Sequence, residues 1–206
     1  MRILPLICLS FFAMKALAQK PFEGRIEFKV EYLSMPDGWE GVDKMLPQKA
    51  TWLVRGGQTR IVQHVPLAGW QVLIYRPQLD SFYQQIELFD QQMLFAKPLS
   101  FEPNRYRAVP QLETKEIVGL ETKKMILQSA FGQVIEVWYT TKFSNTLGTE
   151  LPEIKGLPLQ FEVMRNGIKY RLTALSIKEE PVDDTYFIIP NDVVRIHVSE
   201  LQKILE

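Results

Sequence analysis

Few side chains in this sequence have the types and spacing that metal or cofactor chemistry requires. The two histidines, His64 and His197, lie 133 positions apart in unrelated surroundings. A metal site built on imidazole would need both of them, together with carboxylates. Each histidine has a valine beside it and is better explained as a polar residue of a strand. The sequence therefore predicts no metal site and no cofactor.

Catalytic arrangements are equally scarce. Asp183 and Asp184 are adjacent, and adjacent side chains point to opposite sides of an extended chain, so we expect a turn after Pro181 rather than an acid–base pair. No serine lies in a Gly-x-Ser-x-Gly setting. Gly56-Gly57 lacks the length and the lysine of a phosphate-binding loop. We therefore predict no catalytic residues, and a secreted hydrolase with a polar cleft is only a minor alternative.

Aromatic side chains are the remaining candidates for a site. If several of them project into a half-closed sheet, they line a cavity for an apolar ligand; if they pack against one another, they form an ordinary core. The volume of the cavity separates these two interpretations. The candidate ligand-binding residues on predicted strands or their edges are Trp52, Trp70, Phe82, Trp138, Phe161 and Tyr170.

The elements that position these residues have a period of two. Apolar residues from Ile26 to Tyr32 alternate with charged residues from Arg25 to Glu31, which predicts a strand with one buried face. The segment 133–140 is apolar on both faces, so we expect both faces to be covered. The other predicted strands span residues 52–54, 59–62, 71–75, 81–86, 114–118, 123–128, 159–165, 168–176 and 186–189, and 92–96 is an additional candidate.

Three turns predict hairpins and their registers. Gly56-Gly57 places Trp52 opposite Ile61 and Val54 opposite Thr59. A second hairpin is expected around Gly119-Leu120. Asn166-Gly167 is a preferred type I′ pair, and one register then matches apolar with apolar and acid with base. The pairs expected from this last turn are Val163–Tyr170, Phe161–Leu172, Leu159–Ala174, Glu162–Arg171 and Gln160–Thr173.

Short helices and an irregular connection complete the expected architecture. Apolar residues at spacings of three and four within 39–48 favour a short helix that ends at Pro47. Ser199 is expected to cap a final helical turn or two. Pro98, Pro103 and Pro110 interrupt the stretch after Phe95, which predicts an irregular connection. The fold class is therefore mainly β: a curved antiparallel half-barrel of about ten or eleven strands, with one or two short helices over its open face.

The N-terminus resembles an export signal. Arg2 precedes a largely apolar run, and Ala16-Leu17-Ala18 is a small-x-small cleavage site. The apolar run of about a dozen residues is shorter than the roughly 20 that span a bilayer, so we expect residues 1–18 to be removed and the mature chain to have no membrane span. The only cysteine, Cys8, leaves with the signal, which excludes disulfides and thiol chemistry. The predicted location is the periplasm or the exterior.

Composition fits one exported domain over residues 19–206. With 46% hydrophobic residues the chain is able to build a sizeable core. Removing Arg2 and Lys15 leaves 22 basic residues against 24 acidic ones, a net charge of about −2. Nucleic-acid binding needs a concentrated basic face, which this balance does not supply, so nucleic acid is not an expected partner.

Several short motifs resemble a known family. Gly156-Leu157-Pro158, within residues 153–163, resembles the Gly-Leu-Pro stretch of secreted bacterial β-proteins with a GLPGLI-like motif. The segments 44–47, 117–124, 136–140 and 187–190 match further stretches of that family in order. Leu159 stands where the common motif has a second glycine. Such proteins look like relatives of the lipoprotein-carrier (LolA-like) fold, and the resemblance implies an apolar concavity without catalytic residues.

These observations lead to two hypotheses from different classes. The leading one is non-catalytic binding or carriage of a hydrophobic small molecule, a lipid or a lipid-modified chain in the cell envelope. The alternative is a structural or interaction module that binds an envelope protein through its sheet face or edge. A packed interior together with a contiguous exposed apolar patch would favour the alternative.

Overall fold

The computed structural model describes residues 19–39, 41–66, 69–88, 91–98, 106–130, 132–145, 147, 151, 153–165, 167–189 and 194–196. Three features considered above lie outside these residues: the predicted signal 1–18, which includes Cys8; the second histidine, His197; and the predicted helix from Ser199. No helix in the described part of the chain is long and apolar enough to cross a membrane.

The described strands form a single open sheet, so the predicted mainly β fold is confirmed. Of its 13 strands, β1 and β13 pair in parallel with β10 and β7, and the other 11 are antiparallel. The sheet order is β13-β7-β6-β5-β4-β3-β2-β12-β11-β10-β9-β8. The strands are β1 (Lys20–Pro21), β2 (Gly24–Ser34), β3 (Lys49–Arg55), β4 (Gln58–Val65), β5 (Gly69–Arg76), β6 (Ser81–Leu88), β7 (Gln91–Pro98), β8 (Tyr106–Ile117), β9 (Leu120–Ser129), β10 (Val134–Ser144), β11 (Gly156–Arg165), β12 (Ile168–Glu179) and β13 (Val194–Ile196).

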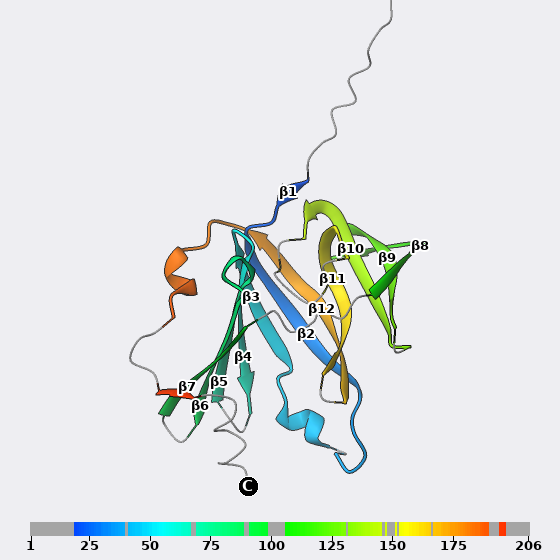
Figure 1. Cartoon of the computed structure of the whole chain (residues 1–206). Coiled ribbons are helices and arrows are strands. Elements are labelled where there is room, and N and C mark those ends of the chain that lie inside the picture. The colour runs from blue at the N-terminus through cyan, green and yellow to red at the C-terminus, as the bar shows by residue number, and fades with distance from the viewer. Residues whose placement is uncertain are drawn as a thin grey trace, which may run out of the picture.

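Two meanders make up this sheet. Strands β2 to β7 follow one another in space, as do β8 to β12, and the meanders meet where β2 pairs with β12. In Figure 1 the two meanders curve away from this central pair. The first and last strands of the chain's main body thus lie side by side at the middle of the sheet, with Ile26 opposite Ile177.

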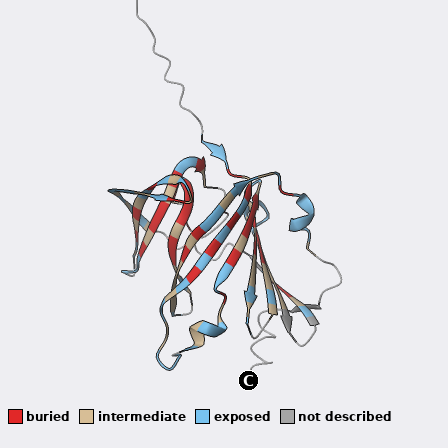
Figure 2. Ribbon diagram, turned by 180° about the vertical axis from the view of Figure 1, so that it is seen from behind, coloured by how far each residue is buried: buried red, intermediate tan, exposed pale blue. Residues whose placement is uncertain are grey.

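The predicted registers are largely confirmed. Trp52 lies opposite Ile61 and Val54 opposite Thr59. In the β11–β12 hairpin, Val163 lies opposite Tyr170 and Glu162 opposite Arg171, and the pairs Phe161–Leu172 and Gln160–Thr173 are also present. Ile26, Phe28 and Val30 are buried while the residues between them are exposed, and Figure 2 shows this alternation along β2.

Two expectations about β8 and β9 were wrong in detail. The turn consists of Val118 and Gly119, one residue earlier than predicted, because Ile117 pairs with Leu120. Both turn residues have positive φ, 46° and 75°, as a type I′ turn requires. Pro110 lies within β8 instead of an irregular connection. It is tolerated because β8 is an edge strand, where a missing N–H breaks no second ladder.

The prediction of a strand over residues 186–189 is wrong. A 3₁₀ turn, η3 (Asp184–Phe187), begins where the Asp183 carboxylate accepts a hydrogen bond from the Thr185 N–H at 2.8 Å. Local capping therefore prevails over the apolar pattern. Val182 and Phe187 pack with Leu53 and Ile74 as a small second core on the face of the first meander opposite Trp52.

The other helical turns are equally short. The predicted helix within 39–48 is the 3₁₀ turn η1 (Val42–Met45), and η2 (Pro77–Leu79) connects β5 to β6. η1 ends at Met45, and its C-cap residue Leu46 directly precedes the predicted stop at Pro47. It lies at the lower end of the sheet in Figure 1.

The main core lies on the concave side of the sheet. Phe28, Trp52 and Phe161 form its centre, with ring centroids 5.0–5.8 Å apart. Towards one end, the connection between β10 and β11 inserts the fully buried Leu147 and Ile154. Thr59 of β4 donates a hydrogen bond to the Leu147 carbonyl. This bond holds the connection between β10 and β11 against the first meander. That end of the concavity is therefore filled.

Candidate functional site

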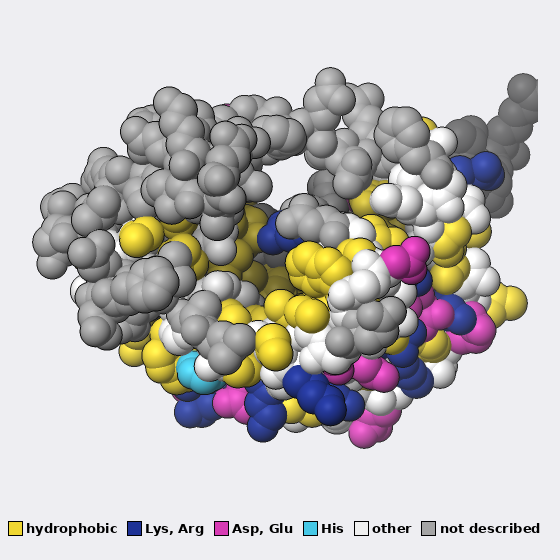
Figure 3. Space-filling model, turned by 90° about the horizontal axis from the view of Figure 1, so that it is seen from below, with side chains coloured by type: hydrophobic (Ala, Val, Ile, Leu, Met, Phe, Trp, Pro, Cys, Tyr) yellow, Lys and Arg dark blue, Asp and Glu magenta, His cyan; other side chains and the backbone are white. Residues whose placement is uncertain are grey.

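The opposite end of the concavity is hollow. It contains a cavity of about 430 Å³ whose walls come from β2 to β6, from Tyr106 of β8, from β10 to β12, and from the segments around η1 and before β11. Figure 3, which views the molecule from below, shows the hollow with hydrophobic side chains around it. The volume lies within the range of roughly 300–1,000 Å³ that is usual for small-molecule sites.

In the first meander, residues that face the concave side and pair across neighbouring strands form rows. The size and type of the side chains in each row determine where the cavity begins. The row Val54–Thr59–Tyr75–Phe82 is buried, and of these four residues only Tyr75 lines the cavity. The next row, Trp52–Ile61–Leu73–Gln84, lines the cavity. The row after that, Ala50–Gln63–Gln71, also lines it. The small Ala50 side chain and the two glutamines leave space that large apolar residues fill elsewhere.

Three of the six predicted aromatic residues come together at this cavity. Trp52, Phe161 and Tyr170 all line it. Trp52 and Phe161, which come from different meanders, are 5.8 Å apart between ring centroids. The ring centroid of Tyr170 lies 6.0 Å from that of Tyr32, which also lines the cavity. The period of two already places Tyr32 on the buried face of its strand.

The other three predicted residues do not line it. Phe82 is buried, and its ring centroid lies 4.8 Å from that of Tyr75. Trp70 is 58% exposed and stacks edge-on with His64 at 5.2 Å. Trp70 lies near the start of β5, on the face opposite to the lining residues Gln71 and Leu73. The assignment of Trp70 and Phe82 to a ligand site stays a prediction.

Trp138 also lies outside the cavity, on the outer face of β10. Lys115 Nζ lies 4.0 Å from the centre of its ring, and the indole N–H donates to Glu136 Oε1 at 2.7 Å. Burial lowers the pKa of Lys115, and the Glu136 carboxylate partly opposes this effect. The outer face of this strand is covered as predicted, but the cover consists of charged side chains rather than a second layer.

Glutamine amides are polar groups of the site that were not predicted from the sequence. Gln63, Gln71 and Gln84 come from three adjacent strands and all line the cavity. Gln63 Nε2 donates to Gln71 Oε1 at 3.2 Å. Their signal was present in the sequence: each occupies an inward position in a strand whose other inward positions are mostly apolar.

A tyrosine hydroxyl connects the cavity wall to the η1 segment. Tyr32 of β2 donates to the Pro47 carbonyl at 2.8 Å. Burial, and then the nearby Tyr170, raise the pKa of Tyr32 above its ordinary value, so the phenol is neutral and remains a donor. The contact holds Leu46 and Pro47, which also line the cavity, against the sheet.

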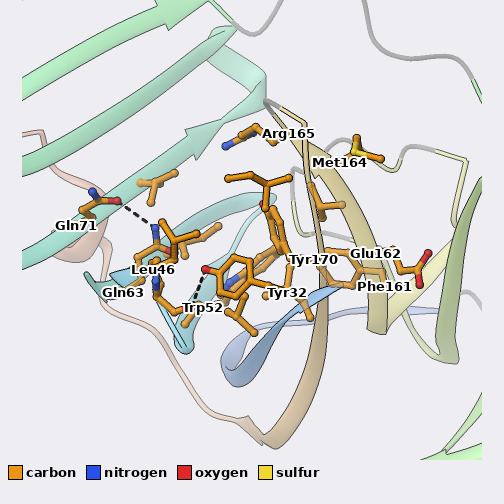
Figure 4. Close-up of a pocket in the computed structure, with 18 of the residues that line it drawn as sticks. Tyr32, Leu46, Trp52, Gln63, Gln71, Phe161, Glu162, Met164, Arg165 and Tyr170 are labelled. Atoms are coloured by element: carbon orange, nitrogen blue, oxygen red, sulfur yellow. Dashed lines mark hydrogen bonds between the residues drawn. The ribbon is translucent and has the colours of Figure 1, made fainter. Parts of the chain in front are cut away.

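Charged side chains near the cavity are balanced. Glu162 lies between Lys169 Nζ at 2.9 Å and Arg171 Nη2 at 2.8 Å, and in Figure 4 it points away from Gln63 and Gln71. Burial by itself raises the pKa of Glu162, but the hydrogen bonds from Lys169 and Arg171 outweigh it and hold that pKa below its ordinary value. Arg165 lines the cavity at the end of β11 and has an interaction partner.

No group of three or more His, Cys, Asp or Glu residues within the described part of the chain is arranged to hold a metal ion. Asp183 and Asp184 have structural roles. Asp183 caps η3, and Asp184 pairs with Arg55 at 3.1 Å. The turn expected at these two residues is therefore confirmed.

Comparison with solved structures supports the fold. The chain aligns with PNGF-II in two crystal forms, at TM-scores of 0.54 and 0.53 and identities of 17% and 16%, over 89% of this chain. It spans only about a third of PNGF-II's length. It also aligns with an uncharacterised conserved protein from Thermus thermophilus, at a TM-score of 0.50 and 10% identity, over 85% of this chain and 91% of that protein.

A weaker match is the Mycobacterium tuberculosis lipoprotein LppX, at a TM-score of 0.42 and 14% identity over 78% of this chain and 89% of LppX, too low for an argument. No family model and no curated protein matches the sequence. At these identities the matches to PNGF-II and the Thermus protein indicate a shared fold only. The GLPGLI-like resemblance stays a prediction.

Proposed function

We propose that this protein binds or carries a hydrophobic molecule, such as a lipid or a lipid-modified chain, in this cavity and outside the cytoplasm, without catalysing a reaction. The cavity itself is the observation that supports the proposal most directly. Its walls are largely apolar, formed by residues such as Trp52, Leu73 and Phe161. The export signal expected at residues 1–18 and the resemblance to carrier-like proteins agree with it.

The energetics of such binding are reasonable. Each methylene removed from water contributes about 0.8 kcal/mol, so ten contribute about 8 kcal/mol, which is on the order of the free energy of micromolar binding. Association costs reduce this sum, so an alkyl chain alone binds weakly and additional contacts to the ligand are needed for tight binding.

The alternative, an interaction module, is less well supported. It was expected to have a packed interior, whereas about 430 Å³ of the concave side is hollow. Its remaining support is the edge strand β8, where the Leu112 side chain is fully exposed. Charged neighbours such as Glu113 and Glu116, which discourage strand addition, weaken that support.

Native mass spectrometry of the protein purified from its own cells tests the proposal. The expected result is a mass above that of the polypeptide, which returns to the bare value after denaturation and extraction into organic solvent. A bare polypeptide mass under gentle conditions, together with no binding of a fluorescent acyl probe by the delipidated protein, would contradict the proposal.

Cavity-filling variants make this test specific. Ala50→Leu and Val65→Phe add volume at two lining positions, and each is expected to weaken probe binding roughly ten-fold, because about two buried methylenes lose their place. Ala108→Leu is the matched control, since Ala108 is exposed on β8. Circular dichroism confirms that each variant is folded.

A further inference from the structure

The neutral amide side chains of the cavity wall lie on one side. Gln63, Gln71 and Gln84 lie on β4, β5 and β6. The wall across the cavity carries aromatic and aliphatic side chains such as Phe161 and Leu172, and its two charged residues, Glu162 and Arg165, already have interaction partners. Figure 4 shows Gln63 and Gln71, joined by their hydrogen bond, apart from Phe161 and Tyr170. The cavity is therefore amphipathic.

These amides have hydrogen-bonding capacity that the protein does not use. A primary amide has two N–H donors and a carbonyl with two lone pairs. The Gln63–Gln71 bond uses one donor and one acceptor. The side-chain amide of Gln84 has no hydrogen-bond partner among the described residues. A group that both donates and accepts would complement such a wall.

An orphaned donor lies in the same part of the cavity. Trp52 is 4% exposed, and its indole N–H has no acceptor among the residues that the structure describes. Trp52 and Gln84 belong to one cross-strand row. Buried donors in folded proteins are nearly always paired with protein, water or ligand, so an acceptor on a ligand would satisfy this group.

Charge argues against an ionised ligand head. Among the described lining residues, Glu162 is already paired with Lys169 and Arg171, and Arg165 has its own partner. The three glutamines are neutral. A bare carboxylate moved into this wall would lose its hydration without gaining an unpaired cation, which is strongly unfavourable.

We propose that the ligand is an uncharged amphiphile, an alkyl chain with an amide or hydroxyl-ester head, and that Gln63, Gln71 and Gln84 recognise this head by hydrogen bonds. The inference rests on the proposed function, because it names the ligand class of the same cavity. The alkyl part lies against Trp52, Leu73 and Phe161, and the head against the glutamines.

Three probes with the same ten-carbon chain test the inference on the delipidated protein: decanamide, decanoate and 1-chlorodecane. Each is measured by displacement of a bound fluorescent acyl probe at neutral pH. Wild-type protein is expected to bind decanamide roughly 30- to 150-fold more tightly than 1-chlorodecane, as two or three net hydrogen bonds predict. Decanoate is expected to bind more weakly than decanamide.

Substitutions of the glutamines test whether these side chains cause the preference for decanamide. Gln71→Met and Gln84→Met keep the side-chain length and are each expected to reduce the decanamide preference roughly five-fold. Gln85→Met is the matched control, because Gln85 follows Gln84 on the opposite face of β6, where its amide pairs with Gln92 at 2.9 Å. This control is expected to leave the preference unchanged.

The outcomes separate the two proposals. Equal binding of decanamide and 1-chlorodecane, tighter binding of decanoate, or an unchanged preference in both Gln71→Met and Gln84→Met overturns the uncharged-head inference and leaves hydrophobic binding intact. Failure of all three probes and of the acyl reporter to bind overturns the proposed function and this inference with it.

Discussion

Glu162 is the one charged residue that is buried among those whose side chains the structure describes. The hairpin register predicted its pairing with Arg171, and the structure adds Lys169 as a second partner, 2.9 Å away. Replacing it by glutamine, Glu162→Gln, removes the negative charge and leaves two cations without their counter-ion. We expect a loss of about 2 kcal/mol in the free energy of unfolding at pH 7, measured by urea denaturation.

The same substitution predicts a pH dependence. The pKa of Glu162 is lower in the folded protein than its ordinary value of 4.5, so the carboxylate stabilises the fold above pH 4.5 and this contribution is lost as pH falls through the lowered folded pKa. The stability difference between wild type and Glu162→Gln should therefore be constant near neutrality and shrink below about pH 4.5. Glu27→Gln, an exposed control on β2, should show no such convergence, and a pH-independent difference for Glu162→Gln would refute the argument.

Tyr32 allows a second prediction at this scale. Its hydroxyl binds the Pro47 carbonyl at 2.8 Å, so Tyr32→Phe removes one hydrogen bond while keeping the ring. We expect a stability loss of about 1 kcal/mol and faster amide hydrogen exchange confined to residues 41–48. Unchanged exchange in that segment would mean that its packing, rather than this bond, holds it.

Side-chain placement was only partly predictable from the sequence. Trp52 and Phe161 lie on strands with a clear inward face, so a period of two placed them correctly. Trp138 lies on a strand that is apolar on both faces, where periodicity does not choose a side. The glutamines were missed because a polar residue at an inward position becomes meaningful only when the hollow beside it is known.

Among the elements, β11 shows what the Gly-Leu-Pro stretch does. A Cβ on Gly156 would lie 2.3 Å from the Thr140 carbonyl oxygen and 2.5 Å from Tyr139, so β10 passes too close for any side chain. Pro158 lies opposite Tyr139, at the irregularity in the β10–β11 register, where a missing N–H is tolerated. Leu159, in place of the second glycine, is fully buried.

Gly156→Ala is therefore expected to destabilise the protein by roughly 3 kcal/mol, because backbone atoms of β10 must move. Gly38→Ala is an informative comparison: Gly38 has φ +82° and nothing lies within 4 Å of where its Cβ would be, so the substitution should cost only about 1 kcal/mol through backbone strain. Thermal and urea denaturation measure both variants. Equal losses would show that close approach to β10 is not what requires glycine.

Elements with strong turn chemistry were predictable, and those decided by neighbours were not. Gly56-Gly57 and the Asn-Gly sequence at 166–167 predicted two hairpins, because few residue types other than glycine and asparagine tolerate the positive φ that such turns require. Pro110 misled because nothing in the sequence marks β8 as an edge strand. The segment 186–189 misled because the Asp183 cap and packing on Leu53 and Ile74 decide its conformation.

For the whole molecule, cooperativity depends on the seam between the two meanders. Only β2 and β12 pair across it, yet Phe161 of the second meander contacts both Phe28 and Trp52 of the first, with centroids 5.8 Å apart in each case. Neither meander buries its concave face alone. We therefore expect a single cooperative transition despite the open sheet.

Trp52 and Trp138 report on this prediction, because they belong to different meanders. In single-tryptophan variants with the other tryptophans replaced by phenylalanine, the urea midpoints seen by Trp52 and by Trp138 fluorescence should change together when Phe161→Ala is introduced. The substitution removes a buried ring from the seam and should cost about 3–5 kcal/mol, whereas Met164→Ala, at an exposed position of the same strand, should change neither midpoint appreciably. A shift confined to one tryptophan would mean that the meanders unfold independently, and the hollow between them would then be an interface between two separately stable halves rather than a cavity within one cooperative sheet.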